Sequence, residues 1–193
     1  MAKPSRRLLR SIEKNLADLS NCILKRRAYN AFMDLHSRHT LDFFRIAMHA
    51  LRDDMFAEAH RVFDTHKDAA SFFYIQRVAP AAFNRALKKS STNFQELQVI
   101  AAKLSKIRNR VQFHTAKKDV EIPEEVWKDA DMSGNEFIRL TEQAHEILRL
   151  MNLELALEDH LIPDYHGEDI EHILRACEAS PNVKGLYVPL RKP

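Results

Sequence analysis

The sequence predicts an all-helical protein: a bundle of four to five long helices, followed by a short C-terminal helix and an extended tail. Four separate stretches place apolar residues alternately three and four positions apart, as one buried face of an α-helix requires. The 193 residues include only three glycines, whereas sheets joined by tight turns usually need more of them. Hydrophobic residues make up 45% of the chain, which is enough to form a core.

The first half of the chain predicts three helical segments, at about residues 4–35, 40–64 and 68–89. Pro4 suits a first helical turn, where its missing N–H costs nothing. The apolar stripe that follows consists of Leu9, Ile12, Leu16, Leu19 and Ile23. The second segment has a wider apolar face, so we expect it to be central. Pro80 should break or kink the third segment, because proline lacks the N–H donor and clashes with the preceding turn.

The second half of the chain predicts a fourth helix from Ser91 or Thr92, and a fifth from Ser133. Thr92 with Gln95 and Ser133 with Glu136 both have the form of a capping box. We expect one short helix near 124–131 and a last one over 168–179, with an extended tail after Pro181. The apolar stripe of the fourth helix consists of Leu97, Ile100, Leu104, Ile107 and Val111.

The charge is unevenly distributed, although the net charge is only +3. Residues 1–30 have a net charge of +6 and residues 85–118 of +8, whereas residues 121–171 have −12. We divide the chain into a helical bundle, residues 1–120, and an acidic helical extension, residues 121–193, packed on the bundle. The basic parts either bind a polyanion or are neutralised by the acidic part, and the sequence leaves both readings open.

Several classes of function receive no support from the sequence. Cys22 and Cys177 are the only cysteines, and the basic start at Met1 is followed by no long apolar run. We expect a reducing, cytoplasmic location and no membrane segment. The chain has no phosphate-binding glycine loop and no Cys/His spacing typical of zinc, and a pair such as His36 and His39 is expected by chance among ten histidines. We expect neither a metal nor a cofactor.

The segment Arg108-Asn109-Arg110-Val111-Gln112-Phe113-His114 is the strongest candidate for chemistry. A histidine can move the proton of a ribose hydroxyl near neutral pH, and an arginine can hold the phosphate. Cations near a helix C-terminus are also expected without catalysis, because they favour the negative end of the dipole. The neighbouring basic candidates for RNA binding are Lys103, Lys106, Arg110, Lys117 and Lys118.

Geometry restricts how this segment could act. Arg108 and His114 lie roughly 120° apart around an unbroken helix, since each residue turns it by about 100°. They converge only if the helix ends before His114, or if a second helix or subunit brings the two groups together.

The Arg-Asn-x-x-x-x-His pattern resembles that of the HEPN superfamily. The stretches 42–48 and 61–64 look like its abortive-infection branch, and the likeness covers about residues 5–120. It implies a dimeric, metal-independent ribonuclease, a toxin of phage defence controlled by an antitoxin or other regulatory protein, with Arg108 and His114 as the active pair and Asn109 as their support. Degenerate members are RNA-binding or protein-interaction scaffolds. Phe113 and Thr115 depart from the residues common around the family's histidine.

Overall fold

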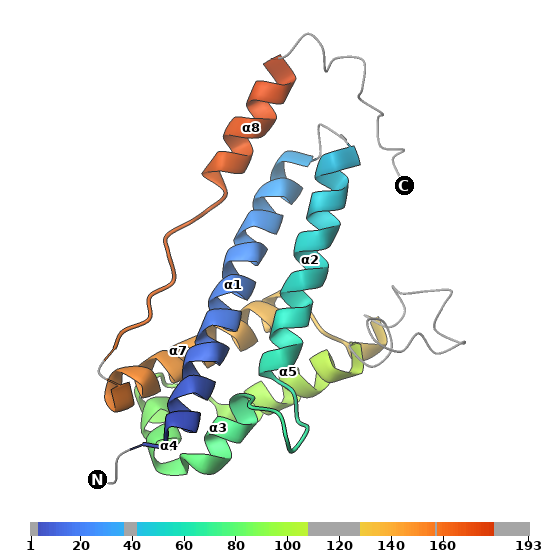
Figure 1. The fold of residues 1–193 in the computed structure, drawn as a ribbon. Helices are drawn as coiled ribbons and strands as arrows, with labels where there is room; N and C mark the ends of the chain where they lie inside the picture. The colour runs from blue at the N-terminus through green and yellow to red at the C-terminus, as the bar shows by residue number, and fades with distance from the viewer. Residues whose placement is uncertain (1–3, 37–41, 108–127, 157, 180–193) are drawn as a thin grey trace. The chain divides into compact units, whose positions relative to one another are not determined.

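The computed structural model describes residues 4–36, 42–107, 128–156 and 158–179, and every regular element in them is a helix (Figure 1). The helices are α1 (Arg6–His36), α2 (Asp42–Val62), α3 (Phe72–Val78), α4 (Pro80–Lys89), α5 (Phe94–Ile107), α7 (Gly134–Ala156) and α8 (Glu168–Ala179). The predicted all-helical class is confirmed. No described helix is long and apolar enough to cross a membrane.

The chain forms two compact units, each assembled from separate stretches of sequence. Unit 1 comprises Met1–Ser20 and Glu58–Leu161, and unit 2 comprises Asn21–Ala57 and Ile162–Pro193. The predicted division near residue 120 falls in the stretch 108–127, which lies outside the described residues.

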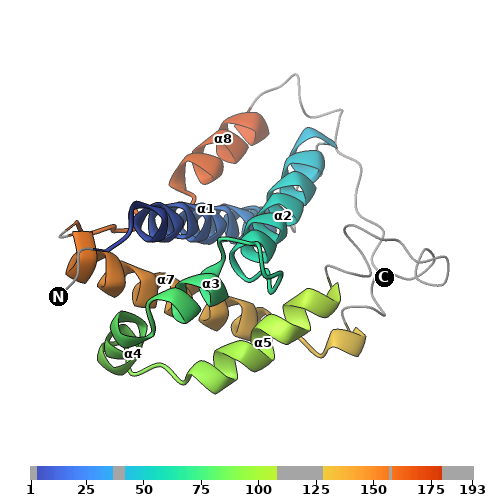
Figure 2. The ribbon, with the colours of Figure 1, turned by 60° about the horizontal axis from the view of Figure 1, so that its bottom comes forward.

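Unit 1 is organised around α7. Both α4 and α5 pack against it, and in the view of Figure 2 α5 crosses α7 at an angle. The buried face of α7 includes Phe137, Leu140, Ala144, Ile147, Leu148 and Met151. Its spacing of three and four residues is the pattern that buries one side of a helix. The first part of α1 adds the fully buried Ile12, Leu16 and Leu19 to the same unit.

A cluster of phenylalanines connects α3, α4 and the start of α5 in unit 1. The ring of Phe83 lies between those of Phe72 and Phe94, with centroid distances of 5.2 and 5.3 Å. Both pairs meet edge to face, the arrangement that aromatic quadrupoles favour. Phe63, just after α2, contacts Phe72 in the same way. This cluster packs the start of α5 against α3 and α4.

Local signals set most of the helix boundaries. Pro80 breaks the third segment as predicted: α3 ends at Val78 and Pro80 starts α4. The predicted box at Ser133 is confirmed, because Ser133 Oγ accepts the Glu136 N–H at 3.2 Å and Glu136 Oε2 accepts the Ser133 N–H at 2.8 Å.

The predicted capping pair Thr92 and Gln95 is wrong, and α5 begins two residues later than Thr92. Asn93 caps the helix instead, because its Oδ1 accepts the Gln95 N–H at 3.1 Å. The Asn93 amide also donates to Glu96 at 3.2 Å. Thr92 instead donates its hydroxyl to the Ser90 carbonyl. Asparagine is at least as good an N-cap as threonine, and the Thr92 hydroxyl is already bonded to Ser90.

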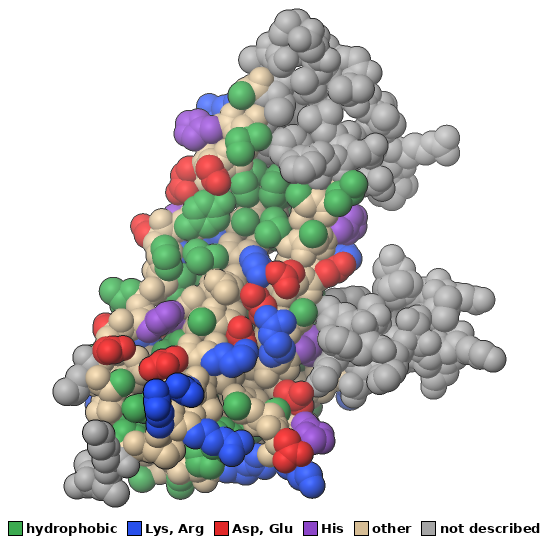
Figure 3. Space-filling view, viewed as in Figure 1, with side chains coloured by type: hydrophobic (Ala, Val, Ile, Leu, Met, Phe, Trp, Pro, Cys, Tyr) green, Lys and Arg blue, Asp and Glu red, His purple; other side chains and the backbone are tan. Residues whose placement is uncertain are grey.

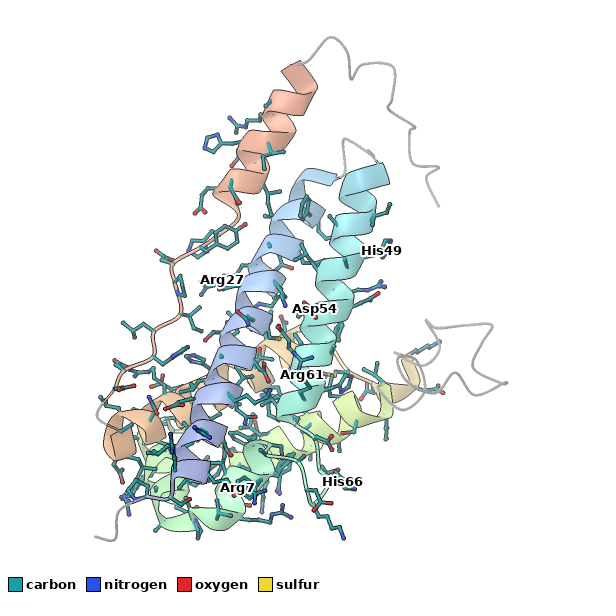
Figure 4. The ribbon with its side chains drawn as sticks, in the orientation of Figure 1. Arg7, Arg27, His49, Asp54, Arg61 and His66 are labelled. Carbon is teal, nitrogen blue, oxygen red and sulfur yellow. The ribbon has the colours of Figure 1, made fainter. Side chains whose placement is uncertain are left out.

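Unit 2 places α8 and the segment before it against the second part of α1. Ala28 and Ile170 are buried there, and Phe32, Leu51 and Tyr165 pack around them. The Arg27 guanidinium donates to the Pro163 carbonyl at 3.0 Å, and Figure 4 labels Arg27 on α1.

Gly167 immediately precedes α8 and has φ +87°. A Cβ at this position would lie 2.3 Å from Ala31 Cβ, so both its backbone and its surroundings require glycine.

We expect Gly167→Ala to lower the free energy of unfolding by about 1–3 kcal/mol, because alanine is strained at this φ and collides with α1. Chemical denaturation followed by circular dichroism measures the change. Gly134→Ala is the matched control, since a Cβ there meets no atom within 4 Å. Equal stability of the two variants would contradict the conclusion that position 167 requires glycine.

Candidate functional site

The described part of the candidate site is the end of α5, directly before the predicted motif. Leu97, Ile100, Leu104 and Ile107 are all at most 2% exposed, so α5 is anchored by its apolar face up to its last described residue. Arg108, Asn109, Arg110 and His114 follow in the stretch 108–127, outside the described residues, as do Lys117 and Lys118. Of the predicted site residues, Lys103 and Lys106 are described.

Lys103 is held by acidic groups of the chain itself. Its ammonium lies 2.8 Å from Glu136 Oε1 and 3.4 Å from Asp131 Oδ2, and it also donates to the Asp131 carbonyl. The hydrogen bond to Glu136 raises the pKa of Lys103. The neutralisation of basic by acidic residues that the sequence left open therefore occurs at Lys103. Lys106 is exposed, and no acidic side chain among the described residues pairs with it.

Glu136 has two tasks at the start of α7. It accepts hydrogen bonds from Lys103 and from the Ser133 backbone, and these lower its pKa to about 2. The carboxylate therefore stays ionised at neutral pH and is unsuited to donate or accept a catalytic proton there. It serves as a fixed anion that joins α5 to α7. A shallow groove of about 370 Å³ lies beside this pair, lined also by Lys128, Met132 and Ser133.

A second polar cluster lies in unit 1, where one serine hydroxyl meets two imidazoles. Ser20 Oγ lies 3.1 Å from His145 Nε2 and 3.1 Å from His160 Nε2. The two rings are tilted, with centroids 5.9 Å apart. A hydroxyl carries one proton, so Ser20 donates to one imidazole and accepts an N–H from the other. In the sequence, Ser20 is 125 positions from His145 and 140 positions from His160, so no local sequence signal indicates this cluster.

Burial makes this cluster structural rather than catalytic. Ser20 is 6% exposed and His145 is 4% exposed, so a substrate has no access to the hydroxyl. Burial and the nearby His160 lower the pKa of His145 to about 4, which keeps its ring neutral at pH 7. The cluster holds the segment that follows α7.

Two further contacts hold the same segment. Arg149 binds both oxygens of Asp159 at 2.7 and 2.9 Å, and the Asn152 amide donates to the Glu158 carbonyl at 2.9 Å. Among the described residues, no three His, Cys, Asp or Glu side chains are placed to bind one metal ion.

We expect the stability of unit 1 to fall as the pH is lowered from about 6.5 to about 4. In that range the unfolded chain binds a proton at His145 that the folded chain does not, so acid favours unfolding. The loss attributable to His145 should be on the order of 2–3 kcal/mol. Denaturant unfolding at several pH values measures it.

Two substitutions test whether His145 causes this pH dependence of stability. His145→Gln should remove that part of the pH dependence, whereas His66→Gln should leave it, because His66 is an exposed histidine of the same unit. If both variants kept the full pH dependence, His145 would not be its source.

The chain was compared with known proteins in three ways, and no family model, curated protein or solved structure matches it.

Proposed function

We propose that this chain is a metal-independent ribonuclease of the HEPN type, and that Arg108, Asn109 and His114 form its active site. The observation that carries the proposal is the Arg-Asn-x-x-x-x-His sequence, which begins one residue after the last buried position of α5 in an all-helical chain. The likeness to the abortive-infection branch adds that the RNA is cleaved as part of phage defence, with an antitoxin or regulatory protein as partner.

The proposed chemistry needs only protein side chains. The ribose 2′-oxygen attacks the adjacent phosphorus, and the bond from phosphorus to the 5′-oxygen breaks, leaving a cyclic phosphate. His114 moves a proton, either from the 2′-hydroxyl or to the leaving 5′-oxygen. Arg108 holds the phosphate and offsets the charge that grows on its oxygens. Asn109 supports the pair.

A second copy of the chain completes the site in this proposal. Arg108 and His114 diverge by roughly 120° on a continuous helix, so one copy's pair does not converge there. A symmetric dimer places two motifs opposite each other, and its two-fold axis then passes near the end of α5.

The alternative is a non-catalytic helical module that binds RNA or a protein. The pairing of Lys103 with Glu136 favours the protein-binding form of this module, because one cation beside the motif is already occupied by the chain's own carboxylate. The departures at Phe113 and Thr115 favour it too. RNA binding by either protein would use the basic residues around the motif, whereas only the ribonuclease requires His114.

We expect His114→Ala to lower RNA cleavage on the order of a hundredfold or more, because it removes the group of the motif that exchanges protons near pH 7. Arg108→Ala should impair cleavage as well and leave part of the RNA binding. The measurement is cleavage of labelled RNA in the presence of EDTA. His66→Ala, at an exposed histidine elsewhere, is the control. Equal activity of wild type and His114→Ala would rule out this mechanism.

We expect the active protein to be a homodimer at tens of micromolar, as measured by light scattering. Mixing the impaired Arg108→Ala and His114→Ala chains should restore part of the activity if the two motifs act together. A strictly monomeric protein with full activity would exclude the dimeric site.

A further inference from the structure

A basic groove lies on the first turns of α1, away from the motif in sequence. It has a volume of about 330 Å³ and is lined by Arg6, Arg7, Arg10, Ser11, Lys14 and Ala70, all in unit 1. Its lining contains four cationic side chains and no acidic one. Figure 3 shows Lys and Arg side chains gathered over this end of α1, and Figure 4 places Arg7 there. A concave surface of one sign raises the local concentration of the opposite charge.

Within the described residues, the arginines of this groove have no acidic partner, in contrast to three other cations of unit 1. Arg85 is paired with Glu154, Lys103 with Glu136, and Arg149 with Asp159. No acidic side chain among the described residues pairs with Arg6, Arg7 or Arg10. Three neighbouring positive charges without an anion repel one another, so a bound anion is favoured at this place.

The remaining contacts in the groove leave its guanidinium groups available. Arg7 lies over the ring of Tyr74, 5.5 Å from the centroid, an interaction that positions the cation without neutralising it. Lys14 is paired with Asp18 at 2.8 Å at the far end of the row. The Lys14 side chain is 60% exposed, and an ion pair at the surface contributes little stability. The Lys14 ammonium can therefore leave Asp18 and bind a phosphate.

The spacing of the cations fits a chain of phosphates better than a single one. Arg6, Arg10 and Lys14 follow one another at intervals of four residues, so they form a row on one side of α1. Eight residues of helix extend about 12 Å, which is long enough to contact more than one phosphate of an extended strand.

We propose that this groove binds the phosphate backbone of single-stranded RNA. The proposal rests on the proposed function for its choice of polymer, but it uses none of residues 108–127. A membrane surface fits less well, because membrane-binding helices combine cations with large apolar side chains, and Ala70 is the one apolar residue in the lining.

The test is binding of a labelled single-stranded RNA of about 12 nucleotides, measured by fluorescence anisotropy across a range of salt concentrations. The double variant Arg6→Gln/Arg10→Gln should bind at least tenfold more weakly at low salt. The slope of log affinity against log salt should become shallower by about 1.4, since each lost single-strand phosphate contact removes about 0.7. Both side chains are exposed, so the melting temperature should stay the same.

The matched control is Arg52→Gln/Arg175→Gln, which removes the same charge from two arginines that are paired with Asp53 and Glu171 and whose side chains are 42% and 71% exposed. It should leave the salt slope unchanged. A second variant, Asp18→Asn, should tighten binding a few-fold, because it releases Lys14 and removes a negative charge near the groove. An equal loss of affinity in the control would show a general effect of net charge and overturn the proposal.

Three further results would also overturn it, and the assay separates them from failure of the ribonuclease. Tighter binding of an RNA duplex would exclude a single-strand groove. Binding to vesicles of anionic lipid through Arg6 and Arg10, without RNA binding, would assign the groove to membranes. Wild-type cleavage with unchanged binding in Arg6→Gln/Arg10→Gln would reject the groove and leave the ribonuclease. RNA binding through the arginines without any cleavage would support the groove and reject the ribonuclease.

Discussion

Burial of one face of α7 is the interaction on which unit 1 depends, because α4 and α5 both pack against this helix. Leu140, Ile147, Leu148 and Met151 are completely buried along it. Truncating one such side chain to alanine typically costs about 2–5 kcal/mol, a large part of the stability of a domain. The position of α5, and with it the start of the proposed active segment, is therefore set by packing on α7.

The same helix also determines which charges of unit 1 remain available. Glu136 near its start binds Lys103 of α5, and Glu154 near its end binds Arg85 of α4. The acidic character of this part of the sequence therefore neutralises cations of the helices that pack on it. Buried polar groups on α7, such as His145 and Asn152, also hold the segment that follows the helix. The one helix therefore positions both the helices that pack on it and the segment after its C-terminus.

Local signals explain why much of the fold was predictable from sequence. The alternating apolar positions indicated the helices, Pro80 indicated the break, and Ser133 with Glu136 indicated the start of α7, because each acts within about one helical turn. The correct cap of α5 was not predicted, because Thr92 and Asn93 are both favourable capping residues and capping preference alone does not decide between them.

The candidate site was less predictable because its contacts are long-range. Charge blocks indicated that acidic and basic segments could pair, but no pattern singled out Glu136 as the partner of Lys103, 33 residues away. The cluster of Ser20, His145 and His160 had no local signal at all, since packing alone brings these residues together. Arg108 and His114 were identified from the sequence pattern, and their placement lies outside the described residues.

The two interpretations of the uneven charge are not exclusive, because each applies to different cations of unit 1. On α4 and α5, Arg85 and Lys103 are neutralised by α7, so a polyanion would have to displace carboxylates to reach them. On the first turns of α1, Arg6 and Arg10 meet no described carboxylate, so a polyanion displaces only water and counterions. If the chain binds RNA, affinity should therefore come mainly from unpaired cations, and the net charge of a stretch of sequence is a poor guide to where binding occurs.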